Sequence, residues 1–267
     1  MKKMGVIGVG MMGSAIVSGV IESGIIPGEK MWLSNTNPAK LHSRCKAFGA
    51  NAAASNAEAA EGADVVLLAV KPQHLSGVLQ ELKGKISPEA LLLTVVAGVP
   101  ISRYQAELGH ERIVRVMPNT PAQVGKGVSA WCVSEAVTEE QKHLTEEILG
   151  SLGEQIQVPT EAMLDKVTAV SGSGPAYVFL FMEAMIDAGV HMGLSRNDAQ
   201  KLVLQTVEGS AAFMRMRGEH PAVLRNEVTS PGGTTAEALS VMEREGLRSA
   251  VADGMWACYR RTLELGK

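Results

Sequence analysis

The chain has 267 residues, of which 46% are hydrophobic and 20% charged, and its formal net charge is −3. This composition supports a sizeable core and excludes a disordered protein, and the length allows one large domain or two ordinary ones. The weak negative charge gives no electrostatic footprint for nucleic acid or an anionic membrane. The cysteines Cys45, Cys132 and Cys258 are widely separated and lack the spacing of a metal site. We therefore expect a cytoplasmic protein with idle thiols and no bound metal.

Residues 4–13 carry the first informative motif, a short apolar run that leads into Gly8, Gly10 and Gly13 at G-x-G-x-x-G spacing. In a strand–turn–helix unit the first glycine permits a tight turn, the second admits a pyrophosphate, and the third lets the helix pack close to the strand. The N-terminus of the following helix offers N–H groups and partial positive charge to phosphate oxygens. A signal peptide is a poor alternative, because cleavage would delete this turn and no A-x-A site is present.

The first part of the chain predicts alternating strands and helices. The apolar runs at 65–70 and 91–96 show no alternation, which is typical of parallel strands covered on both faces. Thr138 and Gln141 have the spacing of a capping box. Strands are expected at 4–9, 31–35, 65–70, 91–96, 113–117, 127–133 and 155–158, and helices at 14–22, 38–48, 57–61, 72–82, 101–108 and 139–149. Residues 1–159 are thus predicted to form an α/β domain with a doubly wound, parallel Rossmann sheet.

After Pro159 the strand patterns stop, so residues 160–267 are predicted to form an all-helical domain. Ser195 and Asp198 form another expected capping pair. Residues 177–186 are apolar on all sides except at Glu183, and such a helix needs burial all round. We therefore expect self-association through the C-terminal helices, as a homodimer or a higher oligomer. Within this domain, helices are expected at 175–193, 196–217, 236–245 and 247–265.

The residues after the second expected strand bear on the choice of cofactor. Dinucleotide folds usually place an acid there to bind the ribose hydroxyls, whereas this chain has Ser34, Asn35 and Thr36. Hydroxyls and amides can donate to a 2′-phosphate, and Lys40 or Arg44 could add positive charge. This pattern favours NADP(H), with NAD(H) possible. The alternative is a simple turn followed by two solvated cations.

Residues 230–235, Ser-Pro-Gly-Gly-Thr-Thr, stand directly before an expected helix. Glycines next to a helix N-terminus make an anion site suited to a substrate carboxylate. The alternative is a capping box formed by Thr234 and Glu237. Because one hydroxyl suffices for a cap, Thr235 would be left to face the cleft.

A third unusual segment, Ser-Gly-Ser-Gly-Pro-Ala-Tyr, occupies residues 171–177. It reads either as a helix start with Pro175 in the first turn or as part of the cleft lining. The residues alone leave both interpretations open.

Together with residues 69–73, 96–98 and 117–121, the glycine motif and the two segments at 171–177 and 230–235 resemble those of the pyrroline-5-carboxylate reductases. The resemblance covers essentially the whole chain. That family implies reduction of the cyclic imine 1-pyrroline-5-carboxylate to L-proline, the last step of proline synthesis. It also implies a Rossmann domain and a helical domain that interlocks with a partner, so that each cleft borrows residues across the dimer. The matching segments are, in order, 8–13, 69–73, 96–98, 117–121, 171–177 and 230–235.

The resemblance also implies the site residues. The substrate would lie over the nicotinamide, and Thr235 would be the catalytic hydroxyl that hydrogen-bonds the ring nitrogen. One departure concerns the turn after the second strand, where many relatives carry a basic residue and this chain does not. The cofactor residues would be Gly8, Gly10, Met11, Met12 and Gly13 at the pyrophosphate, Ser34, Asn35 and Thr36 at the 2′-phosphate, Asn56 at the adenosine, and Ala69, Val70, Lys71, Pro72, Ala97, Asn119 and Thr120 at the nicotinamide half. The substrate residues would be Ser230, Gly232, Gly233, Thr234, Thr235 and Glu161.

The implied chemistry fits these residues. Hydride passes from nicotinamide C4 to the imine carbon, and positioning with one hydrogen bond to nitrogen can supply much of the rate. Lys71 is an alternative acid, although a lysine at a strand end more often serves cofactor phosphates or ribose. A β-hydroxyacid dehydrogenase would need a base such as Lys166 and leaves residues 230–235 unexplained. A non-enzymatic nucleotide sensor would not require a second anion site.

Overall fold

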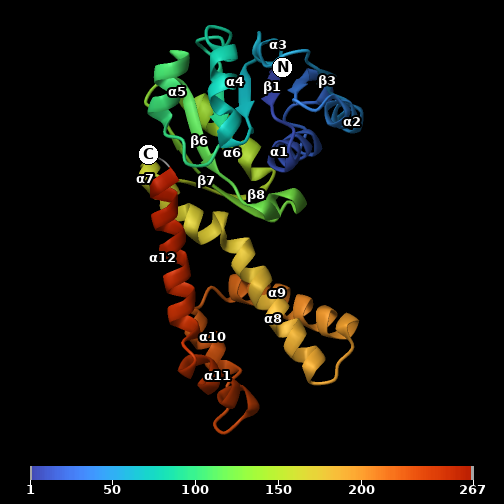
Figure 1. Cartoon of the computed structure of the whole chain (residues 1–267), viewed down its shortest axis with the longest axis vertical. Coiled ribbons are helices and arrows are strands. Elements are labelled where there is room, and N and C mark those ends of the chain that lie inside the picture. The colour runs from blue at the N-terminus through green and yellow to red at the C-terminus, as the bar shows by residue number, and fades with distance from the viewer. Residues whose placement is uncertain (1, 266–267) are drawn as a thin grey trace. The chain divides into compact units, whose positions relative to one another are not determined.

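The computed structural model describes residues 2–265, which divide into two compact units (Figure 1). The first unit contains the residues up to Ser173 together with the end of the chain from Cys258. The second unit is Gly174–Ala257. A sheet with flanking helices forms the first unit, and the second unit is helical throughout.

The sheet of the first unit has eight strands in the order β3-β2-β1-β4-β5-β6-β7-β8. Neighbouring strands run parallel except β6 and β7, which are antiparallel. Because β1 lies between β2 and β4, the strand order reverses at β1, and ligands bind at such a switch point in folds of this type. The strands are β1 (Met4–Ile7), β2 (Met31–Ser34), β3 (Asn51–Ala52), β4 (Val65–Leu68), β5 (Leu91–Thr94), β6 (Ile113–Met117), β7 (Gly127–Val133) and β8 (Gly153–Gln157).

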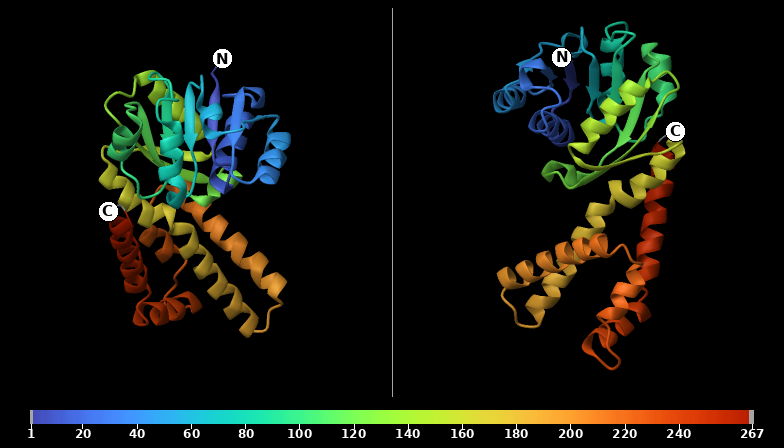
Figure 2. Two further views of the ribbon diagram at one scale, coloured as in Figure 1. Left: turned by 45° about the horizontal axis from the view of Figure 1, so that its top comes forward. Right: turned by 180° about the vertical axis from the view of Figure 1, so that it is seen from behind.

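Helices cover both faces of this sheet (Figures 1 and 2). Alternate strand residues point to opposite sides: Val65 and Leu67 join the core beneath α1, α2 and α6, while Val66 and Leu68 join the core beneath α3, α4, α5 and α7. This burial on both faces confirms the doubly wound arrangement. The helices are α1 (Met11–Glu22), α2 (Pro38–Phe48), α3 (Asn56–Ala60), α4 (Leu75–Leu82), α5 (Ile101–Leu108), α6 (Glu139–Gly150) and α7 (Glu161–Val167), with short turns η1 (Gly28–Lys30), η2 (Pro72–His74) and η3 (Thr120–Val124).

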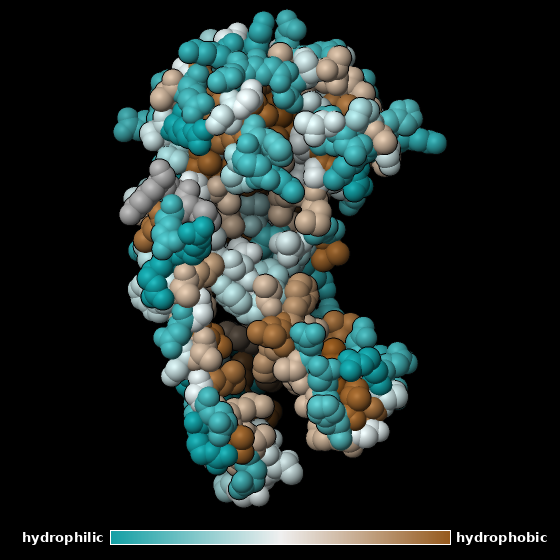
Figure 3. All heavy atoms as spheres, in the orientation of Figure 1, coloured by the Kyte–Doolittle hydropathy of each residue, from teal (hydrophilic) through white to brown (hydrophobic). Residues whose placement is uncertain are grey.

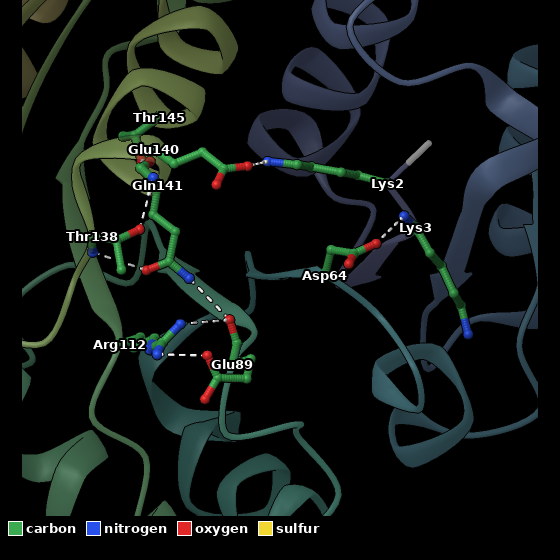
Figure 4. A network of polar contacts seen from close by, with 9 residues as sticks. All are labelled: Lys2, Lys3, Asp64, Glu89, Arg112, Thr138, Glu140, Gln141 and Thr145. Atoms are coloured by element: carbon green, nitrogen blue, oxygen red, sulfur yellow. Dashed lines mark hydrogen bonds and ion pairs between the residues drawn. The ribbon is translucent and has the colours of Figure 1, made fainter.

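Polar contacts bind together the amino ends of the strands (Figure 4). The Lys3 backbone N–H donates to the Asp64 carboxylate at 2.7 Å, just before β1 and β4. The predicted capping box of α6 is confirmed, since Thr138 and Gln141 each accept a hydrogen bond from the other's backbone N–H. The Gln141 amide also donates to the Glu89 carbonyl oxygen at 3.0 Å, just before β5. These contacts fix the edge of the sheet opposite the expected ligand site.

Two features of the sheet depart from the expectations. The short strand β3 was not predicted, because a two-residue strand that pairs only with Trp32 and Leu33 leaves no periodic pattern. The antiparallel β7 departs from the parallel prediction. Residues 118–126, which connect β6 to β7, are too few for the crossover of a dozen or more residues that a parallel pair needs.

Helix α7 packs with the sheet, although the sequence placed residues 160–267 together in the helical domain. It contacts β6 and β7, and Leu164 is buried in the core of the first unit. Arg115 on β6 forms ion pairs with Glu161 and Asp165 on α7. Pro159 therefore marks the end of the last strand, β8, but the first unit continues beyond it through α7.

After α7 a π-helical turn, η4 (Thr168–Gly172), leads into α8 (Gly174–His191). Ser195 caps the next helix as predicted, because its hydroxyl accepts from the Asp198 backbone N–H at 3.1 Å. Helix α10 was not predicted, since its seven residues are too few to show an apolar period. The remaining helices are α9 (Arg196–Arg217), α10 (Pro221–Glu227), α11 (Thr234–Arg244) and α12 (Leu247–Leu265).

The second unit has almost no core of its own. Among its residues only Gly189, Ala199 and Val203 are buried, whereas Phe179 is 64% and Leu180 67% exposed. A groove of about 600 Å³ between α8 and α9 is lined mainly by apolar side chains, and Figure 3 shows hydrophobic surface gathered over these helices. Exposed apolar surface on this scale marks an interaction site, which agrees with the expected self-association.

We predict that Phe181→Asp abolishes self-association. Phe181 lies on α8 and is 44% exposed within the single chain. An unpaired carboxylate buried in the subunit interface costs several kcal/mol, about enough to disrupt a dimer. Sedimentation should show a monomer or an insoluble protein, whereas the control Phe181→Leu should associate normally. A well-folded Phe181→Asp dimer would show that α8 lies outside the interface.

Candidate functional site

The glycine turn after β1 has the geometry expected of a phosphate-binding turn. Gly8 has a φ of +96°, and a Cβ there would lie 2.6 Å from the Ala69 carbonyl oxygen. A Cβ on Gly13 would lie 2.1 Å from the Gly8 carbonyl oxygen, so this glycine permits the close approach of α1. A Cβ on Gly10 would meet nothing within 4 Å. Neighbouring backbone atoms therefore leave no room for a side chain at Gly8 or Gly13. At Gly10 the space is open, and a ligand can approach the backbone there.

The N-terminus of α1 is suited to an anion. No side chain caps this helix, and its first turn contains no acid. Met11, at the first helical position, is 69% exposed. Uncapped N–H groups and the positive end of the helix dipole favour a phosphate at this end. Together with the open side of Gly10, these features fit a dinucleotide pyrophosphate.

Backbone hydrogen bonds bring the turn next to the other expected cofactor residues. The Gly8 N–H donates to the Ser34 carbonyl oxygen at 2.9 Å, and the Ala69 N–H donates to the Ile7 carbonyl oxygen at 2.9 Å. The carboxyl ends of β1, β2 and β4 therefore lie side by side at the switch point. Val70, Lys71 and Pro72 follow β4 directly, and Lys71 is exposed there.

Ser34 and Asn56, both expected near the adenosine, are in contact. The Ser34 hydroxyl donates to Asn56 Oδ1 at 2.6 Å, and Ser34 is only 6% exposed. Asn56 is held in turn by Glu81 of α4, which accepts from its amide at 2.7 Å and from its backbone N–H at 2.8 Å. Ser34 thus positions Asn56. Because the Ser34 hydroxyl proton is donated to Asn56, it is not available to a 2′-phosphate. Sequence reasoning missed Glu81, because nothing in the local pattern of α4 connects it to residue 56.

The remainder of the turn after β2 offers donors to a 2′-phosphate. Asn37 caps α2, since its Oδ1 accepts from the Lys40 backbone N–H at 3.0 Å, as the simple-turn interpretation requires. Asn35 is half-buried, and Thr36 is exposed at the tip of the turn. The Asn35 amide donates to the Asn37 carbonyl oxygen at 3.4 Å, so a side-chain contact with a 2′-phosphate would fall to its second N–H and to the Thr36 hydroxyl.

The residues expected at the nicotinamide half lie in the loops after β5 and β6. Ala97 is exposed in the loop between β5 and α5, and Thr120 is exposed at the start of η3. Asn119 is 9% exposed, and its Oδ1 accepts from the Val128 backbone N–H at 3.0 Å. This buried amide fixes the return of the chain into β7, a role that the sequence did not indicate.

The glycine–threonine segment at residues 230–235 lies in the second unit, at the start of α11. Gly232 has a φ of +66°, and a Cβ on Gly233 would lie 2.4 Å from the Ser230 hydroxyl. Gly233 is the N-cap residue, and no side chain caps the helix. The expected capping box of Thr234 with Glu237 is therefore wrong, because Thr234 is the first helical residue. Both threonine hydroxyls are left for other partners.

The segment at residues 171–177 spans the end of η4 and the start of α8, and Pro175 lies in the first turn of α8 as one interpretation predicted. The preceding turn η4 is π-helical, a conformation frequent at functional sites. A Cβ on Gly172 would lie 2.4 Å from the Met117 methyl carbon. Gly172 thus permits the close approach of the Met117 side chain from the end of β6.

Glu161, the expected substrate-side acid, has two partners within the first unit. Its Oε1 accepts from Arg115 Nη1 at 2.9 Å and from the Ile101 backbone N–H at 2.9 Å. Asp165 accepts from Arg115 Nη2 at 3.1 Å. Sequence reasoning missed Arg115, although a cation in the middle of the apolar strand 113–117 was a signal that it required a buried partner.

The glycine turn at the switch point is typical of a dinucleotide-binding oxidoreductase. The exposed apolar surface of the helical unit is typical of a dimerisation domain. Residues 3–98 match the family model "NADP oxidoreductase coenzyme F420-dependent", and residues 161–265 match "Pyrroline-5-carboxylate reductase dimerisation". The pyrroline-5-carboxylate reductase of Escherichia coli (strain K12) is 42% identical over 268 residues, covering 100% of this chain and 99% of that protein. That of Methanosarcina acetivorans is 40% identical over 267 residues, covering 100% and 98%. The chain belongs to the pyrroline-5-carboxylate reductase family.

Solved structures agree with this family. The chain resembles the Coxiella burnetii pyrroline-5-carboxylate reductase with a TM-score of 0.92 and 37% identity, covering 100% and 99% of the two chains. It resembles the Plasmodium falciparum pyrroline carboxylate reductase with NADP bound with a TM-score of 0.90 and 34% identity, covering 100% and 98%. Aquifex aeolicus prephenate dehydrogenase, at 13% identity and a TM-score of 0.56, shares the fold alone.

The match to a dimerisation domain confirms the predicted self-association. By length and composition the helical run Glu161–His191 could cross a membrane, since an 18-residue window within it has a mean hydropathy of 1.3. One helix of this kind is weak evidence for a membrane span. The run falls within residues 161–265, which match the dimerisation family model, and its first part, α7, packs on the sheet.

We predict that Gly10→Val abolishes NADPH binding and leaves the fold intact. A valine Cβ would meet no protein atom within 4 Å, so the side chain would occupy the open side of the turn. The affinity should fall at least about 100-fold, equivalent to about 2.8 kcal/mol. Fluorescence titration with NADPH measures this loss, and circular dichroism checks the fold. The control Gly77→Val also places a side chain in open space and should bind normally; normal binding by folded Gly10→Val would exclude this site.

Proposed function

We propose that this chain reduces 1-pyrroline-5-carboxylate to L-proline with hydride from NADPH, the last step of proline biosynthesis. One observation supports this proposal most directly: in the dimerisation region, α11 has a glycine N-cap and no side-chain cap, as α1 has. The pyrophosphate needs only the first such terminus, at α1. A second anion site is suited to a substrate that carries a carboxylate. The names of the full-length relatives point to the same substrate.

The cofactor assignment rests on the residues at the switch point. Gly8, Gly10 and Gly13, with the N–H groups of Met11 and Met12, would hold the pyrophosphate. Asn35 and Thr36 would donate to the 2′-phosphate, and the NADP-bound Plasmodium falciparum relative supports this preference. NADH remains usable, because the turn lacks the basic residue that would bind the 2′-phosphate most strongly. Asn56 would contact the adenosine, and Ala69, Val70, Pro72, Ala97, Asn119 and Thr120 would flank the nicotinamide, with Lys71 serving phosphate or ribose.

The substrate assignment uses the residues around the start of α11. The backbone N–H groups of Gly232, Thr234 and Thr235 would bind the carboxylate. The Gly233 N–H instead donates to the Ser230 carbonyl oxygen at 3.0 Å, so these two residues would shape the turn. The Thr235 hydroxyl would hydrogen-bond the ring nitrogen and hold the imine in place. When bound, NADPH supplies the hydride that adds to the imine carbon. The imine reacts in its protonated form, so the nitrogen keeps that proton and becomes a neutral amine. The protein then needs only to orient the protonated imine and support one hydrogen bond at nitrogen.

We further infer that the protein works in the cytoplasm with a small-molecule substrate, without nucleic acid or membrane. Cys45, Cys132 and Cys258 are free thiols, which suits a reducing compartment. Burial raises the pKa of Cys132 to about 12, so this thiol stays protonated and unreactive.

The proposed activity is tested by the loss of NADPH absorbance when 1-pyrroline-5-carboxylate is added. A β-hydroxyacid dehydrogenase would instead reduce NADP in the presence of a hydroxyacid. A nucleotide sensor would bind NADPH and turn over neither substrate. If the protein binds NADPH but no imine causes its oxidation, the proposed activity is wrong, and the nucleotide site is unaffected.

We predict that Thr235→Ala lowers kcat by roughly 10- to 1,000-fold, because one positioned hydrogen bond to the reacting nitrogen is lost. The affinity for NADPH should stay near that of the wild type. Steady-state kinetics and NADPH titration separate the two effects. Thr235→Ser should recover most of the rate, and the neighbouring Thr234→Ala, which keeps its backbone N–H, should change kcat by less than about 10-fold. Unchanged turnover in Thr235→Ala would remove this residue from the mechanism.

A further inference from the structure

We propose that Glu161 is a positioning residue for the loop of residues 95–100, and that it acts through the Ile101 N–H and the Arg115 guanidinium without touching the substrate. The loop carries Ala97, the residue assigned to the nicotinamide half. The inference therefore rests on the proposed function and adds to it the group that fixes this wall of the cofactor site.

The loop is anchored where it leaves β5. The Val96 N–H donates to the Thr94 hydroxyl oxygen at 3.3 Å, and that oxygen lies 2.8 Å from the Tyr104 hydroxyl. Thr94 and Tyr104 are fully buried. Burial raises the pKa of Tyr104 to about 12, so the phenol stays protonated and can donate to Thr94. The first end of the loop is thus fixed from inside the core.

Glu161 anchors the other end of the loop. Helix α5 begins immediately after Pro100, and no local side chain caps it. The Ile101 N–H would lack a partner at this terminus, and it donates instead to Glu161 Oε1 at 2.9 Å. The carboxylate also complements the positive end of the helix dipole. A residue remote in sequence therefore supplies the cap that the local sequence lacks.

Arg115 holds the Glu161 carboxylate in this position. Its side chain is 9% exposed and forms ion pairs with Glu161 at 2.9 Å and Asp165 at 3.1 Å. In the sheet, Arg115 is the register partner of Thr94, so the two anchors of the loop lie on adjacent strands. A buried guanidinium that loses a partner is costly. The ion pairs consequently bind α7 and the loop to the same strand, β6. Glu161 Oε1 accepts hydrogen bonds from both Ile101 and Arg115, so this oxygen already has two protein partners.

Three variants separate the contact with the loop from the charge on Arg115. Glu161→Ala removes both contacts, Glu161→Gln keeps an acceptor for the Ile101 N–H, and Asp165→Asn removes one negative charge from Arg115 without touching the loop. A hydrogen bond to a charged group contributes more than one between neutral groups. We therefore expect Glu161→Ala to weaken NADPH binding by about 10- to 100-fold. The amide oxygen of Glu161→Gln can still accept from the Ile101 N–H, and Asp165→Asn leaves that contact in place. Both variants should bind NADPH within about 3-fold of the wild type, even where the weaker pairing of buried Arg115 lowers overall stability.

Two readouts distinguish positioning of the loop from general damage. The fragment 2′,5′-ADP probes only the adenosine half, and its affinity should be unchanged in Glu161→Ala. Amide hydrogen exchange should rise at Ile101 and residues 95–100 in this variant, and remain slow in Asp165→Asn. If Glu161→Ala fails to fold, Glu161→Asp keeps the charge on a shorter side chain and should show the same changes to a smaller extent.

The proposal is overturned if Glu161→Ala, or Glu161→Asp in its place, binds NADPH as the wild type does and shows no faster exchange in the loop. It is also overturned if Glu161→Ala and Glu161→Gln both raise KM for 1-pyrroline-5-carboxylate with NADPH affinity unchanged, because Glu161 would then be the substrate-side acid. A wild type that does not reduce this imine would defeat the proposed function. The hydrogen-exchange comparison would still decide whether Glu161 holds the loop.

Discussion

The close approach of α1 to the end of β1 is the constraint on which the cofactor site depends. Gly8 and Gly13 are in contact at a distance that any side chain on Gly13 would prevent. This contact aims the N-terminus of α1 at the switch point, where the ends of β1, β2 and β4 are joined through backbone hydrogen bonds. The polar contacts of the first unit that Figure 4 draws lie at the opposite edge. At the carboxyl edge of the sheet, by contrast, the uncapped N–H groups of α1 and the open side of Gly10 leave space for a ligand.

Most of this first unit could be predicted from the sequence, because parallel strands buried on both faces leave long apolar runs and a phosphate turn leaves a fixed glycine spacing. The capping pairs at Thr138 and Ser195 were equally local and were confirmed. The turn after β2 was less informative. The same Asn and Thr residues serve a helix cap or a phosphate contact, and the structure shows that Asn37 caps α2 while Ser34 positions Asn56.

The features that sequence reasoning missed depend on contacts between remote residues. The direction of β7 follows from a connection too short for a crossover, and the place of α7 follows from the ion pairs of Arg115. Neither has a periodic signature. The capping box expected at Thr234 was wrong for a different reason: two adjacent threonines after two glycines allow more than one helix start, and the turn from Ser230 to Gly233 selects Gly233 as the cap.

The two units differ in what each can stabilise alone. The first unit buries a core on both faces of its sheet, so its cofactor turn is rigid within a single chain. The second unit leaves Phe179, Leu180 and Trp256 exposed, and a helical unit with so few buried residues gains its stability from a partner. The turn before α11 belongs to this second unit. Subunit association is therefore expected to stabilise the proposed substrate site, whereas the proposed cofactor turn depends on the packing of the first unit.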